Sequence, residues 1–326
     1  MKTALNKISI ALLTIFIIIS LSFLLIRIMP GNTLLNIVGQ EEYYYLLDHN
    51  PEELNRISMK YGLNESLGVQ YVRYLKNIIT LDFGRAYSNH QPVIDNVIEA
   101  SKNTLLLAIP TWLIGGLLGG ILGLFSGWKP GSRFDKITTP VFIFFNTLPS
   151  NCLAILLLII FSYNLKIFPI NNMVSPGVEG MDRVLNILWH MTLPLIILII
   201  GRTSSNFMLM KSSVSQIRKD DYLLTAQSKG LTDRGVLYKH LLINAALPYG
   251  TYLCIQLGYI LSGSMIIEVI FNWKGMGTLM YKAVTARDFP TAQLCFLISA
   301  ILVVTANLIS NLLNIILDPR IKSESS

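Results

Sequence analysis

Charged side chains are scarce in this sequence. Lysine, arginine, aspartate and glutamate make up 14% of its 326 residues, whereas soluble domains carry about 25%. The few charges gather between long apolar runs, and 52% of all residues are hydrophobic. This distribution leaves no room for a large soluble catalytic domain and is typical of a chain embedded in lipid.

Cysteine and histidine are also sparse. The three cysteines, Cys152, Cys254 and Cys295, each lie inside an apolar run, and the four histidines form no pair at ligand spacing. Neither a disulfide framework nor a metal site is expected. The phosphate-binding sequence G-x-x-x-x-G-K-[ST] is missing too, so we expect no ATP hydrolysis, no catalytic residues and no cofactor in this chain.

Six apolar runs are long enough to cross a bilayer, whose hydrocarbon core needs roughly 20 residues per helix. The sequence therefore predicts an all-α membrane protein with six transmembrane helices. Five glycines between Gly115 and Gly123 are expected to let a neighbouring helix approach the second run closely. The six runs are Ile8–Ile28, Thr104–Trp128, Ile137–Tyr163, Ile187–Met210, Tyr249–Phe271 and Ala292–Leu317.

The first run resembles a secretory signal because Lys2 and Lys7 precede it. Its apolar core is longer than the usual 7–15 residues, and no A-x-A cleavage site follows it. We interpret residues 1–29 as an uncleaved membrane anchor, with a cleaved signal peptide as the alternative.

Lysine and arginine are distributed unevenly between the two sides of the expected membrane. The N-terminus, the second–third and fourth–fifth connections and the C-terminus carry thirteen, against five in the short connections of the other side. The positive-inside rule then places both termini in the cytoplasm. In this interpretation the basic residues behind the net charge of +7 set the orientation of the chain in the membrane, and no nucleic-acid partner is expected. The expected units are the anchor, an extracytoplasmic loop (30–103) and a five-helix core (104–326).

The extracytoplasmic loop is long enough to hold helices of its own. One is expected over Pro51–Tyr61, where Asn50 is a cap and Glu52 and Glu53 fill the first turn. A second is expected near Val69–Ile79.

The cytoplasmic connection over 211–248 has the pattern of two helices joined at a glycine. Asp221 suits a helix start, and Gly230 suits its end about two turns later. A second helix is expected to run back to Pro248 at the membrane. Small residues near Gly230 would let another protein approach this backbone. An amphipathic connector lying on lipid headgroups explains the same composition equally well.

Several stretches resemble one transporter family in order along the chain. The spacing Ala226-x3-Gly230, followed by His240, Asn244 and Leu247-Pro248, is similar to the cytoplasmic-loop motif of ATP-binding-cassette importer permeases. The chain is identified more narrowly with the dipeptide/oligopeptide/nickel family of these permeases, although Leu224-Thr225-Ala226 stands where the general motif has Glu-Ala-Ala. The other matching stretches are Met29-Pro30-Gly31, Lys60-Tyr61-Gly62-Leu63-Asn64, Asp82-Phe83-Gly84, Gly263-Ser264-Met265-Ile266-Ile267-Glu268, Gly275-Met276-Gly277, Arg287-Asp288-Phe289-Pro290 and Asp318-Pro319-Arg320.

The resemblance implies a multi-pass permease with the importer fold in a prokaryotic cytoplasmic membrane. Its expected partners are membrane lipid, a second homologous permease, two ATPase subunits that bind ATP and Mg, and an extracytoplasmic solute-binding protein. Alternating access would be driven by the ATPases. The solute is left open among peptides, nickel and metal–chelate complexes. The residues that the resemblance assigns to ATPase coupling are Thr225, Ala226, Lys229, Gly230, Leu231 and His240.

One polar patch interrupts the fourth run. Arg202, Ser205 and Asn206 share a helical face there, and a charge at membrane depth costs about 2.5–3.5 kcal/mol on insertion scales. We predict that this face lines the translocation path, where Arg202 would favour anionic groups such as a carboxylate. The alternative is an arginine paired inside the bundle as a structural contact.

Glu268 is the fourth residue expected on the path, near the outer end of the fifth run. With the segment 273–290 it is expected to form a gate-like region, in which Gly275 and Gly277 allow a sharp turn and Arg287 pairs locally with Asp288. A structural helix without solute contact is the equal alternative.

Two other classes are weaker. An ion-coupled secondary transporter would need a partner acid for Glu268 within the membrane, and the sequence offers none. An intramembrane hydrolase would need a serine–histidine or paired-aspartate pattern, which is also missing.

Overall fold

The computed structural model describes residues 2–28, 31–228, 230–262 and 264–317. Within these ranges the regular structure is helical, apart from one isolated antiparallel bridge between Arg85 and Pro92. Four helices are long and apolar enough to cross a membrane, or five if one bent pair counts as a single span. The chain is therefore an all-α membrane protein. The four long helices are α1 (Lys2–Ile28), α6 (Val93–Trp128), α9 (Gly180–Ile217) and α15 (Phe289–Leu317).

A ridge of four glycines, Gly115, Gly119, Gly123 and Gly127, holds α6 directly against α9. A Cβ built at Gly119 would lie 2.4 Å from Cβ of Asn206, and one built at Gly123 would lie 2.6 Å from the carbonyl oxygen of Phe207. Only a residue without a side chain permits this approach, and the predicted role of the second run's glycines is confirmed. The partners on α9 follow in the same order as the glycines, so the two helices run parallel.

The other side of α6 packs on α12 (Leu242–Gly258). Tyr249 donates a hydrogen bond to the carbonyl oxygen of Gly116. At its far end α12 meets α15, where a Cβ built at Gly258 would lie 2.7 Å from Cβ of Ala306. The first helix, α1, packs along α15 at the rim of the bundle, with Phe23 in their shared core.

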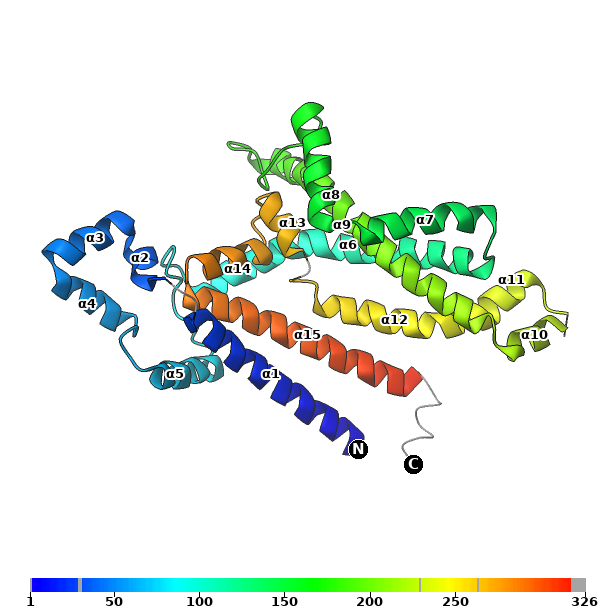
Figure 1. The fold of residues 1–326 in the computed structure, drawn as a ribbon, viewed down its shortest axis with the longest axis horizontal. Coiled ribbons are helices and arrows are strands. Elements are labelled where there is room, and N and C mark those ends of the chain that lie inside the picture. The colour runs from blue at the N-terminus through cyan, green and yellow to red at the C-terminus, as the bar shows by residue number, and fades with distance from the viewer. Residues whose placement is uncertain (1, 29–30, 229, 263, 318–326) are drawn as a thin grey trace.

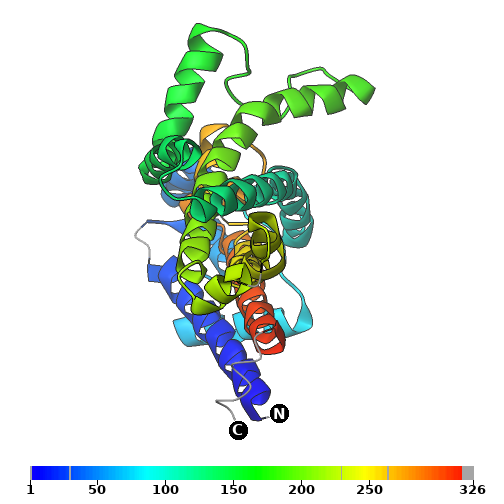
Figure 2. The same ribbon diagram turned by 90° about the vertical axis from the view of Figure 1, so that its right-hand side faces the viewer.

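The third apolar run is bent, in contrast to the single helix expected over Ile137–Tyr163. It forms α7 (Arg133–Thr147), α8 (Ser150–Leu157) and the π-helical turn η1 (Leu158–Asn164), with an angle of 96° at the break. Leu148 precedes Pro149 and has extended backbone angles, φ −72° and ψ 123°. Proline disfavours the helical conformation in the residue before it, which explains the break. Figures 1 and 2 show α8 turning away from α7.

The fifth run also differs from the expected span, Tyr249–Phe271. The helix α12 ends at Gly258, and two short helices follow, α13 (Met265–Ile270) and α14 (Met276–Thr285). The cytoplasmic helix expected to stop at Pro248 instead continues through it into α12. Membrane helices accommodate an internal proline because neighbouring groups satisfy the carbonyl that it leaves unpaired.

The long loop after α1 is folded into helices. They are α2 (Thr33–Val38), α3 (Gln40–His49), α4 (Pro51–Lys60) and α5 (Leu67–Thr80), so both expected loop helices are confirmed. The Asn50 side chain accepts from the Glu53 amide, as a helix cap does. Helix α6 begins at Val93, within the range expected to belong to the loop. We call the end of the bundle that carries α2–α5 the loop end, and the end with the N-terminus of α1 the base (Figure 1).

Candidate functional site

A cavity of about 480 Å³ lies between α6, the α7–α8 bend, α9 and α12. Arg202 lines it from α9, opposite Tyr252 and Gln256 of α12. The base of the Arg202 side chain is fixed against α6, because a Cβ built at Gly115 would lie 2.9 Å from Cβ of Arg202. None of the ion pairs among the described residues involves Arg202. The cavity wall therefore presents a guanidinium without an acidic partner in this part of the chain.

Polar side chains extend the wall on either side of Arg202. Ser205 lines the same cavity and donates to Oδ1 of Asn146 on α7, at 3.0 Å. Asn206 is fully buried and lies outside the cavity lining, where its Oδ1 accepts from Nε2 of Gln256 at 3.0 Å. Arg202 and Ser205 thus lie at the cavity, while Asn206 joins α9 to α12 behind it.

Glu268 occupies a different site, in the hairpin of α13 and α14. Its carboxylate is fully buried and does not line the cavity, although Ser264 beside it does. Oε1 accepts from the hydroxyls of Ser264 (2.7 Å) and Thr104 (2.8 Å). Oε2 accepts from the amides of Gly277 (2.8 Å) and Thr278 (3.2 Å). Glu268 therefore caps the start of α14 from outside that helix.

The glycines beside Glu268 serve close approach rather than the sharp turn that we expected. The φ angle of Gly275 is −96°, which any residue adopts. A Cβ built there would lie 2.4 Å from Oε2 of Glu268, and one at Gly277 would lie 2.5 Å from Cα of Met265. Gly275 and Gly277 thus have no side chains that would occupy the space of the buried Glu268 carboxylate.

Arg287 and Asp288 bind separate segments of the chain instead of pairing with each other. Arg287 donates from Nη1 to the carbonyl oxygen of Gly31, at 2.6 Å. Oδ2 of Asp288 accepts from the amide (3.3 Å) and hydroxyl (3.1 Å) of Ser88. Its Oδ1 accepts from the Thr291 amide at the start of α15 (3.3 Å). The two side chains therefore fasten the long loop to α15.

The connection after α9 forms a compact hairpin at the base. It consists of α10 (Asp221–Ser228), α11 (Asp233–Val236) and the π-helical turn η2 (Leu237–Leu241), which continues into α12. Leu223 of α10 is buried with Val214 of α9 in the core beneath the hairpin. Asn244 donates to the hydroxyl of Tyr222, at 3.0 Å, and so ties α10 to α12.

The predicted coupling residues lie on this hairpin. Thr225 is exposed on α10, and Gly230 at the corner has a φ of +82° that favours glycine. Leu231 follows it on the surface, and His240 lies half-buried in η2. Ala226 lies within α10, and Lys229 lies outside the described residues.

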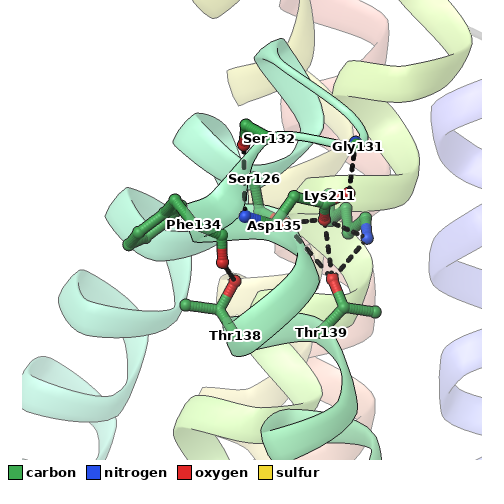
Figure 3. A network of polar contacts seen from close by, with 8 residues as sticks. All are labelled: Ser126, Gly131, Ser132, Phe134, Asp135, Thr138, Thr139 and Lys211. Atoms are coloured by element: carbon green, nitrogen blue, oxygen red, sulfur yellow. Dashed lines mark hydrogen bonds and ion pairs between the residues drawn. The ribbon is translucent and has the colours of Figure 1, made fainter.

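A partly buried ion pair at the base was not predicted from the sequence. Nζ of Lys211 on α9 lies 2.6 Å from Oδ1 of Asp135 on α7. The same oxygen accepts from the hydroxyls of Ser126 (2.6 Å) and Thr139 (2.7 Å), and Oδ2 accepts from the Gly131 amide (2.8 Å). Figure 3 shows these groups converging on one carboxylate. The network locks the base ends of α6, α7 and α9 together next to the hairpin.

Two family models match the chain. The model described as binding-protein-dependent transport system inner membrane component matches residues 119–323. The model for the N-terminal part of binding-protein-dependent transport system membrane components matches residues 1–108.

Curated relatives align with the chain over nearly its full length. It is 30% identical over 308 residues to the oligopeptide transport system permease protein AppB of Bacillus subtilis, with 93% of each chain covered. It is 28% identical over 317 residues to the dipeptide transport system permease protein DppB of Alkalihalophilus pseudofirmus, covering 92% of this chain and 93% of the relative. Identity to the metal-staphylopine import system permease protein CntB of Staphylococcus aureus is 29% over 324 residues, covering 98% of each.

Proposed function

Because the chain belongs to the family of binding-protein-dependent transport system inner membrane components, we propose that the Arg202 cavity forms part of the path of a transported solute. The chain is the permease subunit of an ATP-binding-cassette importer for peptides or metal complexes, in a prokaryotic cytoplasmic membrane. It is the transmembrane component of that importer and not its catalytic subunit.

The observation that carries the proposal is the guanidinium of Arg202 on the wall of a cavity of about 480 Å³, where no described residue forms an ion pair with it. A charge at membrane depth is costly unless it meets water or a partner, and no ion pair among the described residues supplies one. A wet path would solvate the charge between transport cycles. A passing solute with a carboxylate, such as a peptide, would supply the missing partner. The buried-contact alternative for Arg202 lacks the acidic side chain that it needs within this part of the chain.

Coupling is proposed to take place at the hairpin of α10 and α11. It is fixed to α9 and α12 by the Leu223 core and the Tyr222–Asn244 hydrogen bond, so a push on α10 would move those helices as one body. Two ATPase subunits that bind ATP and Mg are the proposed source of that push. A second homologous permease and an extracytoplasmic solute-binding protein complete the proposed assembly.

Six spans with both termini in the cytoplasm are proposed for the topology. The four long helices supply spans one, two, four and six, the bent α7–α8 pair supplies span three, and α12 supplies span five. This arrangement puts the base in the cytoplasm, where the ATPases are, and α2–α5 outside.

The test replaces Arg202 and compares uptake per assembled complex. Arg202→Ala is expected to lower uptake roughly tenfold or more, the usual effect of removing a hydrogen bond to a charged group, while melting temperature stays close to wild type. Arg202→Lys is expected to retain part of the uptake, because an ammonium keeps the charge without the planar fork. Arg183→Ala, at an exposed position of the same helix, is the matched control. Unchanged uptake with a clearly lowered melting temperature for Arg202→Ala would show that the arginine is a structural contact.

A further inference from the structure

A second cavity, of about 400 Å³, lies at the loop end and at the rim of the bundle. Its walls come from the last turn of α1, the helices α4 and α5, the segment 83–87 and the start of α15. We call it the rim cavity. It is separate from the Arg202 cavity, with which it shares no lining residue.

Positive charge dominates the rim cavity. Four of its lining residues are cationic: Arg27, Lys60, Arg73 and Arg85. Of these four, Arg73 alone has an acidic partner among the described ion pairs, the carboxylate of Glu65. The guanidinium of Arg27 stacks on the ring of Phe289, 3.8 Å from its centre. The excess of positive charge in the lining favours binding of an anion.

Buried polar atoms in the same wall have no partner within the described structure. They are Nε of Arg27, Oε1 of Gln70, Oη of Tyr74 and Nε2 of Gln293. Gln70 is 9% exposed and Gln293 is 8% exposed. A buried polar group without a hydrogen bond costs about 1–3 kcal/mol. Such groups clustered in one wall indicate a ligand that supplies both acceptors, for the cations and Gln293, and a donor, for Gln70.

The helix that forms one wall has the character of a membrane-surface helix. Tyr71 and Tyr74 of α5 pack on Phe23 of α1, and the Tyr71 hydroxyl lies 2.6 Å from Oγ of Ser20. Facing away from the bundle, α5 exposes Val69 and Val72, along with other apolar side chains. An amphipathic helix fixed to the end of a transmembrane helix lies at the depth of the lipid headgroups. The rim cavity therefore opens where lipid phosphates are concentrated.

We propose that the rim cavity binds the phosphate of an anionic phospholipid from the leaflet at the loop end. Arg27, Lys60 and Nε2 of Gln293 donate to the phosphate oxygens, and Oε1 of Gln70 accepts from a headgroup hydroxyl, such as that of phosphatidylglycerol. The bound lipid joins α1 and α15 to the folded loop. Free inorganic phosphate offers the same acceptors but neither the hydroxyl nor acyl chains to lie against α5. The proposal concerns lipid binding and is independent of the path assigned to Arg202.

The test measures lipid binding to the purified, assembled importer by native mass spectrometry after delipidation. Phosphatidylglycerol, phosphatidylcholine and inorganic phosphate are titrated separately, and phosphate is also tried as a competitor. The variant is Arg27→Gln with Lys60→Gln. Its matched control, Lys102→Gln with Lys166→Gln, removes two exposed cations outside the cavity and leaves the same net charge.

The wild type and the control are expected to bind one phosphatidylglycerol roughly tenfold more tightly than the double variant, because two charged donors are lost. Phosphatidylcholine is expected to bind all forms weakly. If inorganic phosphate binds the delipidated importer as tightly as phosphatidylglycerol does, the free ion is the occupant and the lipid proposal is overturned. Equal binding of phosphatidylglycerol by wild type and double variant, or equal binding of the two lipids, would overturn the proposal. The proposal would also be overturned if the double variant kept wild-type lipid affinity and lost only its association with the solute-binding protein.

Arg27 also packs on Phe289, so the double variant is at risk of misassembly. A second variant, Lys60→Gln with Gln293→Leu, leaves that contact intact. It is expected to weaken phosphatidylglycerol binding while the complex elutes as wild type in size-exclusion chromatography. Wild-type lipid affinity in this second variant would also overturn the proposal.

Discussion

The contact between α6 and α9 gives a quantitative prediction for Gly119→Ala. The added Cβ would lie 2.4 Å from Cβ of Asn206 and 2.7 Å from the carbonyl oxygen of Thr203. Carbon atoms in contact are normally about 3.5–4.0 Å apart, so α9 must move back by about 1 Å. Both nearest atoms belong to backbone or to Cβ and cannot rotate away. Overpacking of this kind costs about 1–3 kcal/mol.

The matched control is Gly250→Ala, in the middle of another membrane helix. No atom lies within 4 Å of a Cβ built at Gly250. Alanine is also a better helix former than glycine, so the control is expected to leave stability unchanged or raise it slightly. Melting temperatures of the purified complex, followed by fluorescence-detected size exclusion, compare the two variants. A Gly119→Ala protein as stable as the Gly250→Ala protein would refute the close packing of α6 on α9.

The same displacement has a consequence at the solute cavity. Asn206 contacts Gly119 on one side and accepts the Gln256 hydrogen bond on the other. Retreat of α9 would therefore shift Arg202, one turn away, relative to α12. Gly119→Ala is expected to lower uptake as well as stability, whereas Arg202→Ala is expected to lower uptake alone.

Three further predictions concern the loop end, the hairpin and the topology. Glu268→Gln should destabilise the protein by about 2 kcal/mol or more, because glutamine puts a donating NH2 group where one of the two accepting carboxylate oxygens was. Its melting temperature is compared with that of the same change at an exposed glutamate. Gly230→Val is expected to reduce uptake per ATP hydrolysed, because the backbone at Gly230 has a φ of +82°, which strains a β-branched residue. Gly177 has a φ of +77° in another loop, and the control variant Gly177→Val should transport normally. In a background without native cysteines, Asn55→Cys should react with an impermeant thiol reagent in intact cells and Asp233→Cys should not; the reverse pattern would refute the proposed orientation.

Features coded by local sequence could be predicted well. The helix expected over Pro51–Tyr61 is α4, which ends one residue earlier, because a cap, a proline and acidic first-turn residues act within a few positions of each other. The closely packed face of the second span followed from glycine spacing alone. Apolar runs also indicated the four helices that, among the described residues, are long and apolar enough to cross a membrane.

Features that depend on distant segments could not be predicted. Hydropathy gives the length of an apolar run but not its direction, so the 96° bend at Leu148-Pro149 was missed. Lys211 and Asp135 are separated by 76 residues, and only the folded bundle brings them together. A local signal for Asp135 existed, because the Ser132 hydroxyl accepts from its amide as in a helix-capping pattern. That pattern predicts a helix start and says nothing about a lysine on another helix.

The motifs that identify the family and the residue proposed to contact the solute lie in different parts of the molecule. Glu268 holds a helix start, Arg287 binds the carbonyl of Gly31, and Asp288 binds the loop through Ser88. These contacts assemble the loop end from segments that are far apart in the sequence. Arg202 belongs to none of these motifs and lies on the cavity wall. Selectivity should therefore change when the cavity lining changes while the motifs stay fixed, and the solute has to be sought from the cavity rather than from the motifs.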